Sequence, residues 1–266
     1  MLIGACTGFI AGNSFGSPWA GVAAAVAAGA LLALIHAFLT VTLRANQVVS
    51  GLAVTLFGTG LSGYLGQDYV GQPAGAVFGK IAVPLLSDIP IIGSILFKQD
   101  ALVYISYFLV PLAAWYFYKT RSGLFLRAMG ENPAAVDAAG INVFGLRYLY
   151  IVVGGALAGV AGAYLSLAYA PSWLENMTAG RGWIAVALVI FALWDPWRAM
   201  AGSYLFGGID ALGFNLQVLG VPVSGFILNM LPYIFTVLVL VLVLKRRGGR
   251  SASPQALGLS YDREER

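Results

Sequence analysis

The chain has 266 residues, of which 59% are hydrophobic and only 10% are charged, and its mean hydropathy is +0.84. Because a soluble domain carries roughly 25% charged residues, this composition excludes an ordinary soluble domain and predicts an integral membrane protein. The single cysteine excludes an internal disulfide and a cysteine metal cluster. The net charge of +4 does not indicate nucleic-acid binding, because its placement along the chain follows membrane topology.

The first quarter of the chain contains three apolar stretches. Residues 1–12 are too few to cross a bilayer, which takes about 20 residues, so we interpret them as the end of a span. Residues 18–42 form an uncharged run of spanning length, which Arg44 ends. Residues 48–66 form another, but glycines and polar residues interrupt it, a pattern typical of a broken or cavity-lining helix.

The middle of the chain alternates between polar and apolar segments. Residues 67–100 contain three prolines and isolated charges, which predict an extramembrane loop with a short interfacial helix. Clear spans follow at residues 101–118 and 148–170, and the polar segment 119–147 separates them.

The last third begins with residues 182–194, an uncharged stretch of marginal length, and the dipeptide Asp195-Pro196 predicts a tight turn after it. Two further apolar runs complete the membrane domain, at residues 199–214 and 218–244. Basic residues end the second run, and we expect the tail, residues 245–266, to be disordered.

These stretches predict an all-α integral membrane protein, a polytopic helical bundle with about six full spans and a partial first one over residues 1–244. If segment 119–147 lies in the cytoplasm, alternation of the spans places the C-terminus on the same side. All but three of the 15 Lys and Arg residues are then cytoplasmic, as the positive-inside rule requires. We therefore expect a multi-pass protein of the bacterial cytoplasmic membrane.

The polar segment 119–147 is centred on a short predicted helix. Asn132 is a good N-cap, Pro133 suits the first helical position, and Gly140 can close the last turn in a left-handed conformation. Residues 134–139 make only about two turns, too few for a helix that is stable alone in water. Such a helix, held between two spans and carrying small residues, is suited to dock into a groove of another protein. The alternative is a capped loop helix that lies on the membrane.

The sequence contains no convincing catalytic site. It has no glycine-rich phosphate loop with its lysine, and helix packing explains His36, the only histidine, which lies in an apolar run. Asp210 is the only acidic residue well inside a predicted span, which gives little support for a proton relay. We therefore expect a transport subunit that is not itself an enzyme and that depends on a partner motor.

Several segments resemble one family of transporters. GLFLRAMGENPAAVDAAGINV, within the polar segment, closely resembles the cytoplasmic coupling segment of ABC-importer permeases related to ribose and branched-chain amino acid systems. Four other stretches resemble the nucleoside branch of that group, whose members work with a binding lipoprotein of the basic-membrane-protein class. These are LRANQVVSGLAVTLFGTGLSG, GGALAGVAGAYLSL, NMTAGRGWIAVALVIFALWDPWRA and LFGGIDAL. Together the stretches cover most of residues 11–244.

The resemblance implies a machine in a lipid bilayer, made of two permease subunits, here non-identical, an ATP-binding subunit and an extracytoplasmic binding lipoprotein. It implies that ATP and Mg are bound by the ATPase and that this chain binds no cofactor. The helix after Asn132 would insert into a cleft of the ATPase and transmit its closure to the spans. The residues that match the family's coupling pattern are Glu131, Asn132, Pro133, Ala134, Asp137, Ala138 and Gly140.

The nucleoside branch implies a neutral, flat solute. Asp210 lies 12 residues after Arg198, about 18 Å along a helix, which places it near the midplane, where its carboxylate could accept from ribose hydroxyls. The aromatic face of Phe57 could stack on a base. The candidate path residues are Asn46, Gln47, Ser50, Thr55, Phe57, Thr59 and Asp210.

Alternatives remain at this point for both the residues and the solute. Asn46 could be a helix cap, Phe57 could face lipid, and Asp210 could make a structural hydrogen bond. A sugar or a branched-chain amino acid is the alternative solute within the superfamily, and a stand-alone channel or ion-coupled carrier is the alternative class. Permeases that resemble this one have a further helix and a glycine-rich segment before the position of Met1, which suggests a mis-assigned start or a truncated chain.

Overall fold

The computed structural model describes residues 1–89, 92–219 and 253–263, together with residues 230, 234, 237, 238 and 241. Two compact units make up the chain. Unit 1 comprises residues 1–107, 128–179 and 256–266, and unit 2 comprises residues 108–127 and 180–255. Apart from two strands of two residues each, every regular element in the described ranges is a helix.

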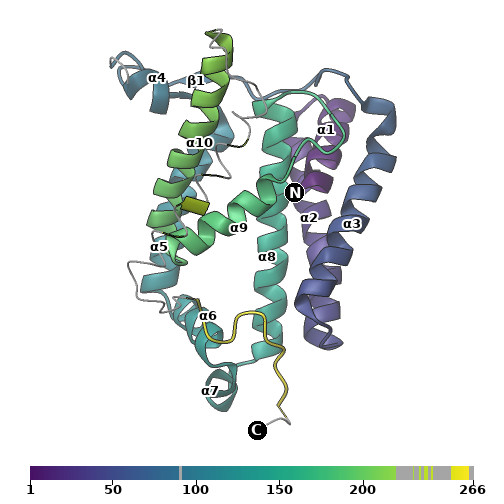
Figure 1. The fold of residues 1–266 in the computed structure, drawn as a ribbon, viewed down its shortest axis with the longest axis vertical. Helices are drawn as coiled ribbons and strands as arrows, with labels where there is room; N and C mark the ends of the chain where they lie inside the picture. Colours follow the sequence, from purple (N-terminus) through teal and green to yellow (C-terminus); the bar gives the residue numbers. More distant parts are fainter. Residues whose placement is uncertain are drawn as a thin grey trace. The chain divides into compact units, whose positions relative to one another are not determined.

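Three helices form the centre of unit 1: α1 (Leu2–Phe15), α2 (Pro18–Ala37) and α8 (Val143–Tyr164). They lie side by side in Figure 1. Two of them continue as π-helical turns, α2 into η1 (Phe38–Thr42) and α8 into η3 (Leu165–Tyr169). Pro18 occupies the first turn of α2, where its missing N–H removes no helical hydrogen bond.

The backbones of these three helices touch at glycines. A Cβ added to Gly4 of α1 would lie 2.5 Å from the carbonyl oxygen of Gly159 in α8, and one on Gly155 would lie 2.6 Å from the carbonyl oxygen of Gly29 in α2. Real Cβ atoms do not approach other atoms this closely, so these positions require glycine. Small residues at helix contacts are the usual means of packing helices in lipid, where no hydrophobic effect drives association.

Helix α3 (Gln47–Gly66) packs on α1 and is continuous over its 20 residues. The sequence predicted a broken or a cavity-lining helix, and the broken form is wrong. Gly58 and Gly66 lie on the buried face of α3, together with Ser50 and Ser62. Gly66 lets a neighbouring side chain approach closely, because a Cβ there would overlap the indole ring of Trp173.

The loop after α3 contains a 3₁₀ turn, η2 (Gln67–Tyr69), a short helix, α4 (Ile92–Leu96), and an antiparallel pair of strands. Strand β1 (Ile81–Ala82) pairs with β2 (Lys98–Gln99) in the register Ile81 to Gln99. This agrees with the predicted loop and short helix. Backbone hydrogen bonds tie the loop to the chain around the end of η3, from Gly71 N to Trp173 O at 2.9 Å and from Phe78 N to Leu167 O at 2.9 Å.

The polar segment forms two helices where the sequence predicted one. Helix α5 (Ala101–Lys119) leads into α6 (Arg121–Glu131), and α7 (Pro133–Ala138) follows directly. The helix α7 and the described part of the tail lie at the end of α8 where that helix begins (Figure 1).

Unit 2 contains a hairpin of two helices, α9 (Arg181–Ala192) and α10 (Pro196–Val218). The turn between them has left-handed backbone at Leu193 and Trp194, with φ of 56° and 59°, and Asp195 caps α10 by accepting from Arg198 N at 2.9 Å. The predicted turn at Asp195-Pro196 is confirmed. Helix α9 has 12 residues and is therefore about 18 Å long, which is too short to cross a bilayer.

Four helical segments in the described ranges are long and apolar enough to cross a membrane: Pro18–Thr42, Gln47–Tyr69, Ala101–Lys119 and Val143–Tyr169. Helices α1 and α9 are apolar but shorter. Most of the predicted run 218–244 and the basic residues that end it lie outside the described residues. A helical membrane protein is therefore confirmed, and the total of six full spans stays a prediction.

Candidate functional site

The short helix α7 has the capped ends that the sequence predicts. Asn132 Oδ1 accepts from Ala135 N at 3.1 Å, and Pro133 is the first helical residue. At the other end Gly140 adopts a left-handed conformation with φ of 79°. The N–H of Gly140 donates to Asp137 O at 2.9 Å, and that of Ile141 donates to Val136 O at 3.3 Å. These two bonds are the pair that defines a Schellman ending.

One face of α7 packs inward, and the other consists of small exposed side chains. Val136 is buried, as is Val143 in the first turn of α8, against which α7 packs. The exposed residues on and around α7 are Glu131, Asn132, Ala134, Ala135, Ala138, Ala139 and Gly140. A two-turn helix with alanines outward offers backbone and methyl groups that a partner's groove could contact closely. Six of these seven residues are uncharged.

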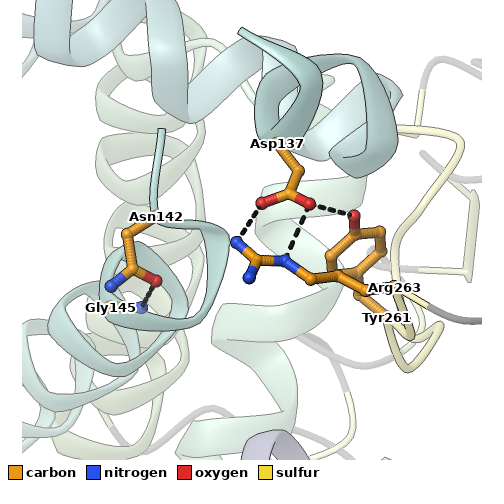
Figure 2. Close-up of polar contacts among 5 residues, drawn as sticks. All are labelled: Asp137, Asn142, Gly145, Tyr261 and Arg263. Atoms are coloured by element: carbon orange, nitrogen blue, oxygen red, sulfur yellow. Dashed lines mark hydrogen bonds and ion pairs between the residues drawn. The ribbon is translucent and has the colours of Figure 1, made fainter. Parts of the chain in front are cut away.

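Asp137, a predicted coupling residue, contacts the tail of the same chain. Its side chain is only 11% exposed. Figure 2 shows Arg263 gripping both carboxylate oxygens of Asp137, through Nη2 at 2.5 Å and Nε at 2.8 Å. The hydroxyl of Tyr261 also donates to Asp137 Oδ2 at 3.0 Å. The tail was expected to be disordered, whereas residues 253–263 of it are described and make specific contacts.

Helix α6 is the element of this segment that the sequence reasoning missed. Thr120 precedes it, and its side-chain oxygen accepts from Gly123 N at 3.0 Å, as an N-cap does. Phe125 and Met129 then follow at helical spacing, and Met129 is buried. A threonine five residues before Phe125, at the start of such a pattern, was the available signal.

The polar atoms of α3 that were predicted to line a path have partners within unit 1. Asn46 Oδ1 caps α3 by accepting from Val48 N at 2.9 Å and Val49 N at 3.1 Å. Ser50 is buried and its Oγ lies 2.9 Å from His36 Nδ1. The alternative interpretation of Asn46 as a helix cap is therefore the one that the geometry supports.

Deeper in α3, three of the predicted path residues are exposed, but they do not share one side of the helix: Thr55 and Thr59 point one way and Phe57 points the other. Thr55 and Thr59 lie one turn apart, and each hydroxyl donates to the carbonyl four residues earlier, at 2.8 and 2.9 Å. Phe57 is 56% exposed. These side chains face away from the packed core, toward either lipid or another protein surface.

Asp210 belongs to unit 2 and pairs with Arg181, the first residue of α9. Arg181 Nη2 lies 3.8 Å from Asp210 Oδ2, and the two side chains are 37% and 53% exposed. At that exposure an ion pair contributes about 0–1 kcal/mol in water. The predicted path residues thus fall into two groups, those of α3 in unit 1 and Asp210 in unit 2.

Comparison with known proteins identifies the family. Residues 1–244 match the family described as the permease component of branched-chain amino acid transport systems. The chain belongs to this family. A putative glucose ABC transporter permease of Haloferax volcanii is 39% identical over 99% of the chain and 87% of its own length. A nucleoside ABC transporter permease of Lactococcus lactis is 39% identical over 93% of the chain and 79% of its own length.

A guanosine ABC transporter permease of Bacillus subtilis is 33% identical to this permease over 98% of the chain and 85% of its own length. No solved structure matches. The resemblance to ABC-importer permeases is therefore confirmed, and the nucleoside and guanosine permeases support the nucleoside branch. The protein is a multi-pass membrane subunit of an ABC transporter and is not itself an enzyme. Permeases of this family function with an ATPase and a substrate-binding protein.

Proposed function

We propose that this permease translocates nucleosides across the bacterial cytoplasmic membrane, driven by a partner ATPase and supplied by a binding lipoprotein. The observation that carries the proposal is the similarity to a nucleoside and a guanosine permease over more than nine-tenths of the chain. A second, non-identical permease subunit would complete the membrane pathway. In this arrangement ATP and Mg belong to the ATPase.

The coupling function is assigned to α7. Its exposed alanines would enter a cleft of the ATPase, and its buried Val136 joins it to α8. Closure of the ATPase on ATP would then move the start of α8, a segment that continues with η3 over 27 residues to Tyr169. This requires α7, segment 119–147 and the C-terminus to be cytoplasmic, as the positive-inside rule predicts.

Two separate sets of residues are candidates for contact with the solute: exposed side chains of α3 in unit 1, and the Arg181–Asp210 pair in unit 2. On one side of α3, Phe57 could stack on a base. On the other side, Thr55 and Thr59 have oxygens that can accept from a solute hydroxyl. Arg181 lies at the far end of α9 from the Asp195 turn, about 18 Å away along the helix axis. If that turn is cytoplasmic, the pair lies near the middle of the bilayer, where charged residues most often serve transport.

Glucose is the second candidate solute, because the putative glucose permease covers 99% of the chain at 39% identity. A sugar and a nucleoside share hydroxyls, so the Asp210 carboxylate suits both. They differ in the base, which only a nucleoside could stack on Phe57.

The test is uptake by the permease assembled with its partner subunits in liposomes. Radiolabelled guanosine and uridine should enter only when ATP is supplied, and unlabelled guanosine should compete while glucose and leucine do not. ATP-dependent uptake of radiolabelled glucose, without uptake of either nucleoside, would transfer the assignment to a sugar. Uptake against a gradient by this chain without any ATPase would refute the importer itself.

A further inference from the structure

Residues 256–263, called here the C-terminal strap, run along three other parts of unit 1. At one end Ala256 N donates to the carbonyl oxygen of Gly130, in the last turn of α6, at 2.9 Å. In the middle Leu259 O accepts from Arg147 Nη1 of α8 at 3.0 Å and from Gln47 Nε2 of α3 at 3.4 Å. The strap thus lies against the coupling segment and the first residues of two long helices.

The first anchor of the strap is Asp137 on α7. The two bonds from Arg263 and the one from Tyr261 occupy both oxygens of this nearly buried carboxylate (Figure 2). Paired charge-assisted bonds of this kind are strong and fix orientation. The ring of Tyr261 packs against Phe144 with centroids 5.8 Å apart, and the guanidinium of Arg263 lies 5.9 Å from the Phe144 centroid. The same two residues therefore hold both α7 and the first turn of α8.

The second anchor lies on the connection between α2 and α3. Asp262 forms an ion pair with Arg44, and the Asp262 side chain is only 16% exposed. Arg44 has a φ of 53°, a left-handed conformation that is unfavourable for a residue with a Cβ and must be held by its surroundings. Arg44 stands three residues before Gln47, the first residue of α3.

We propose that the C-terminal strap positions the coupling helix and joins its movement to the start of α3, through the pairs Arg263–Asp137 and Asp262–Arg44. Because Asp262 and Arg263 are adjacent, their Cα atoms lie about 3.8 Å apart. A displacement of α7 consequently reaches the α2–α3 connection through a single peptide unit. Through the strap, the start of α3 would move when the ATPase moves α7, in addition to the movement that α7 passes directly to α8.

The two ion pairs of the strap have their charges placed in opposite ways. One anchor has the acid on the helix and the base on the strap, whereas the other has the base on the connection and the acid on the strap. Exchanging the two charges of the Arg44–Asp262 pair would therefore keep that anchor, while neutralising either one would lose it. This inference depends on the proposed docking of α7 with an ATPase, so the test includes a variant that reports on docking alone.

The experiment measures ATP hydrolysed per molecule of solute taken up by the complete importer in liposomes, with guanosine as the solute. Arg263→Ala and Asp262→Ala should each raise this ratio about tenfold, the effect of losing a charge-assisted hydrogen bond on an equilibrium. The double variant Arg44→Asp with Asp262→Arg should restore the ratio to within about twofold. Ser260→Ala, at an exposed site in the same strap, is the matched control and should behave as the wild type.

Docking is tested separately by Ala134→Glu, which places a charge on the exposed face of α7 and should prevent co-purification of the ATPase. If Ala134→Glu co-purifies normally, the docking proposal fails. If it does not co-purify, but Arg263→Ala and Asp262→Ala keep the wild-type ratio, the strap proposal alone is overturned. A charge exchange that fails to restore the ratio also overturns it. Loss of stability without loss of coupling would lower the amount of complex and leave the ratio unchanged, which again contradicts the proposal.

Discussion

Replacing Gly140 by valine should uncouple ATP hydrolysis from uptake while leaving the chain inserted in the membrane. The φ of 79° at this position is left-handed, and the N–H groups of Gly140 and Ile141 complete the end of α7 there. A Cβ at Gly140 would meet no atom within 4 Å, so the substitution adds backbone strain and no steric overlap. That strain is about 1–2 kcal/mol for a residue with a Cβ.

A strain of this size shifts a local equilibrium by a factor of roughly 5–30. Because α7 has only six residues, in most molecules of the variant the helix should then lose the two hydrogen bonds that end it. Gly140→Asn is the matched control, since asparagine tolerates the left-handed region, and should keep most of the coupling. The assay is ATP consumed per guanosine taken up, with co-purified ATPase measured in parallel. Wild-type coupling by Gly140→Val would refute the role of the ordered α7 ending.

Three further predictions concern other parts of the chain. Gly159→Ala should destabilise the protein in detergent by about 1–3 kcal/mol, because its methyl group would overlap a carbonyl of α2, whereas Gly154→Ala, with open space at its Cβ, should not lower the unfolding temperature. Phe57→Ala should slow guanosine uptake at saturating binding protein about two- to tenfold, because stacking on the base is lost. Leu56 is also exposed, and Leu56→Ala should not slow uptake. Equal uptake rates for the two variants would place Phe57 against lipid. Asp195→Ala should cost about 1 kcal/mol through the lost cap of α10. The backbone N–H groups of that helix lower the pKa of the Asp195 carboxyl. The contribution of the ionised carboxylate to stability is therefore present above the ordinary carboxyl pKa and disappears as pH falls through the lowered pKa. A stability difference between wild type and Asp195→Ala that persists at pH 2 would contradict this.

Local signals predicted the parts of the structure that local interactions determine. The bounds of α7 follow from Asn132, Pro133 and Gly140, and each of these acts on backbone groups within four residues. The turn at Asp195 is of the same kind. The spans were recognisable because their length and hydropathy reflect the bilayer, whatever their partners in the fold.

The strap could not be predicted in this way. Arg263 and Asp137 are 126 residues apart, and Arg44 and Asp262 are 218 apart, so no spacing rule joins them. The polar, charged composition of the tail favoured disorder, since composition cannot show that its charges have partners elsewhere. The continuity of α3 was missed for a related reason. Glycine weakens an isolated helix. In α3, however, the absence of a side chain at Gly66 makes room for the indole ring of Trp173, which packs directly against the helix.

The direct backbone contact among α1, α2 and α8 determines how this part of the protein can move. Where a layer of side chains separates two helices, rotamer changes can let one helix slide past the other. At Gly4, Gly29, Gly155 and Gly159 no such layer exists, and any relative rotation would bring peptide groups into collision. We therefore expect the three helices to shift as one block, which would carry a displacement at the start of α8 to its other end, where backbone hydrogen bonds join η3 and Trp173 to the loop after α3.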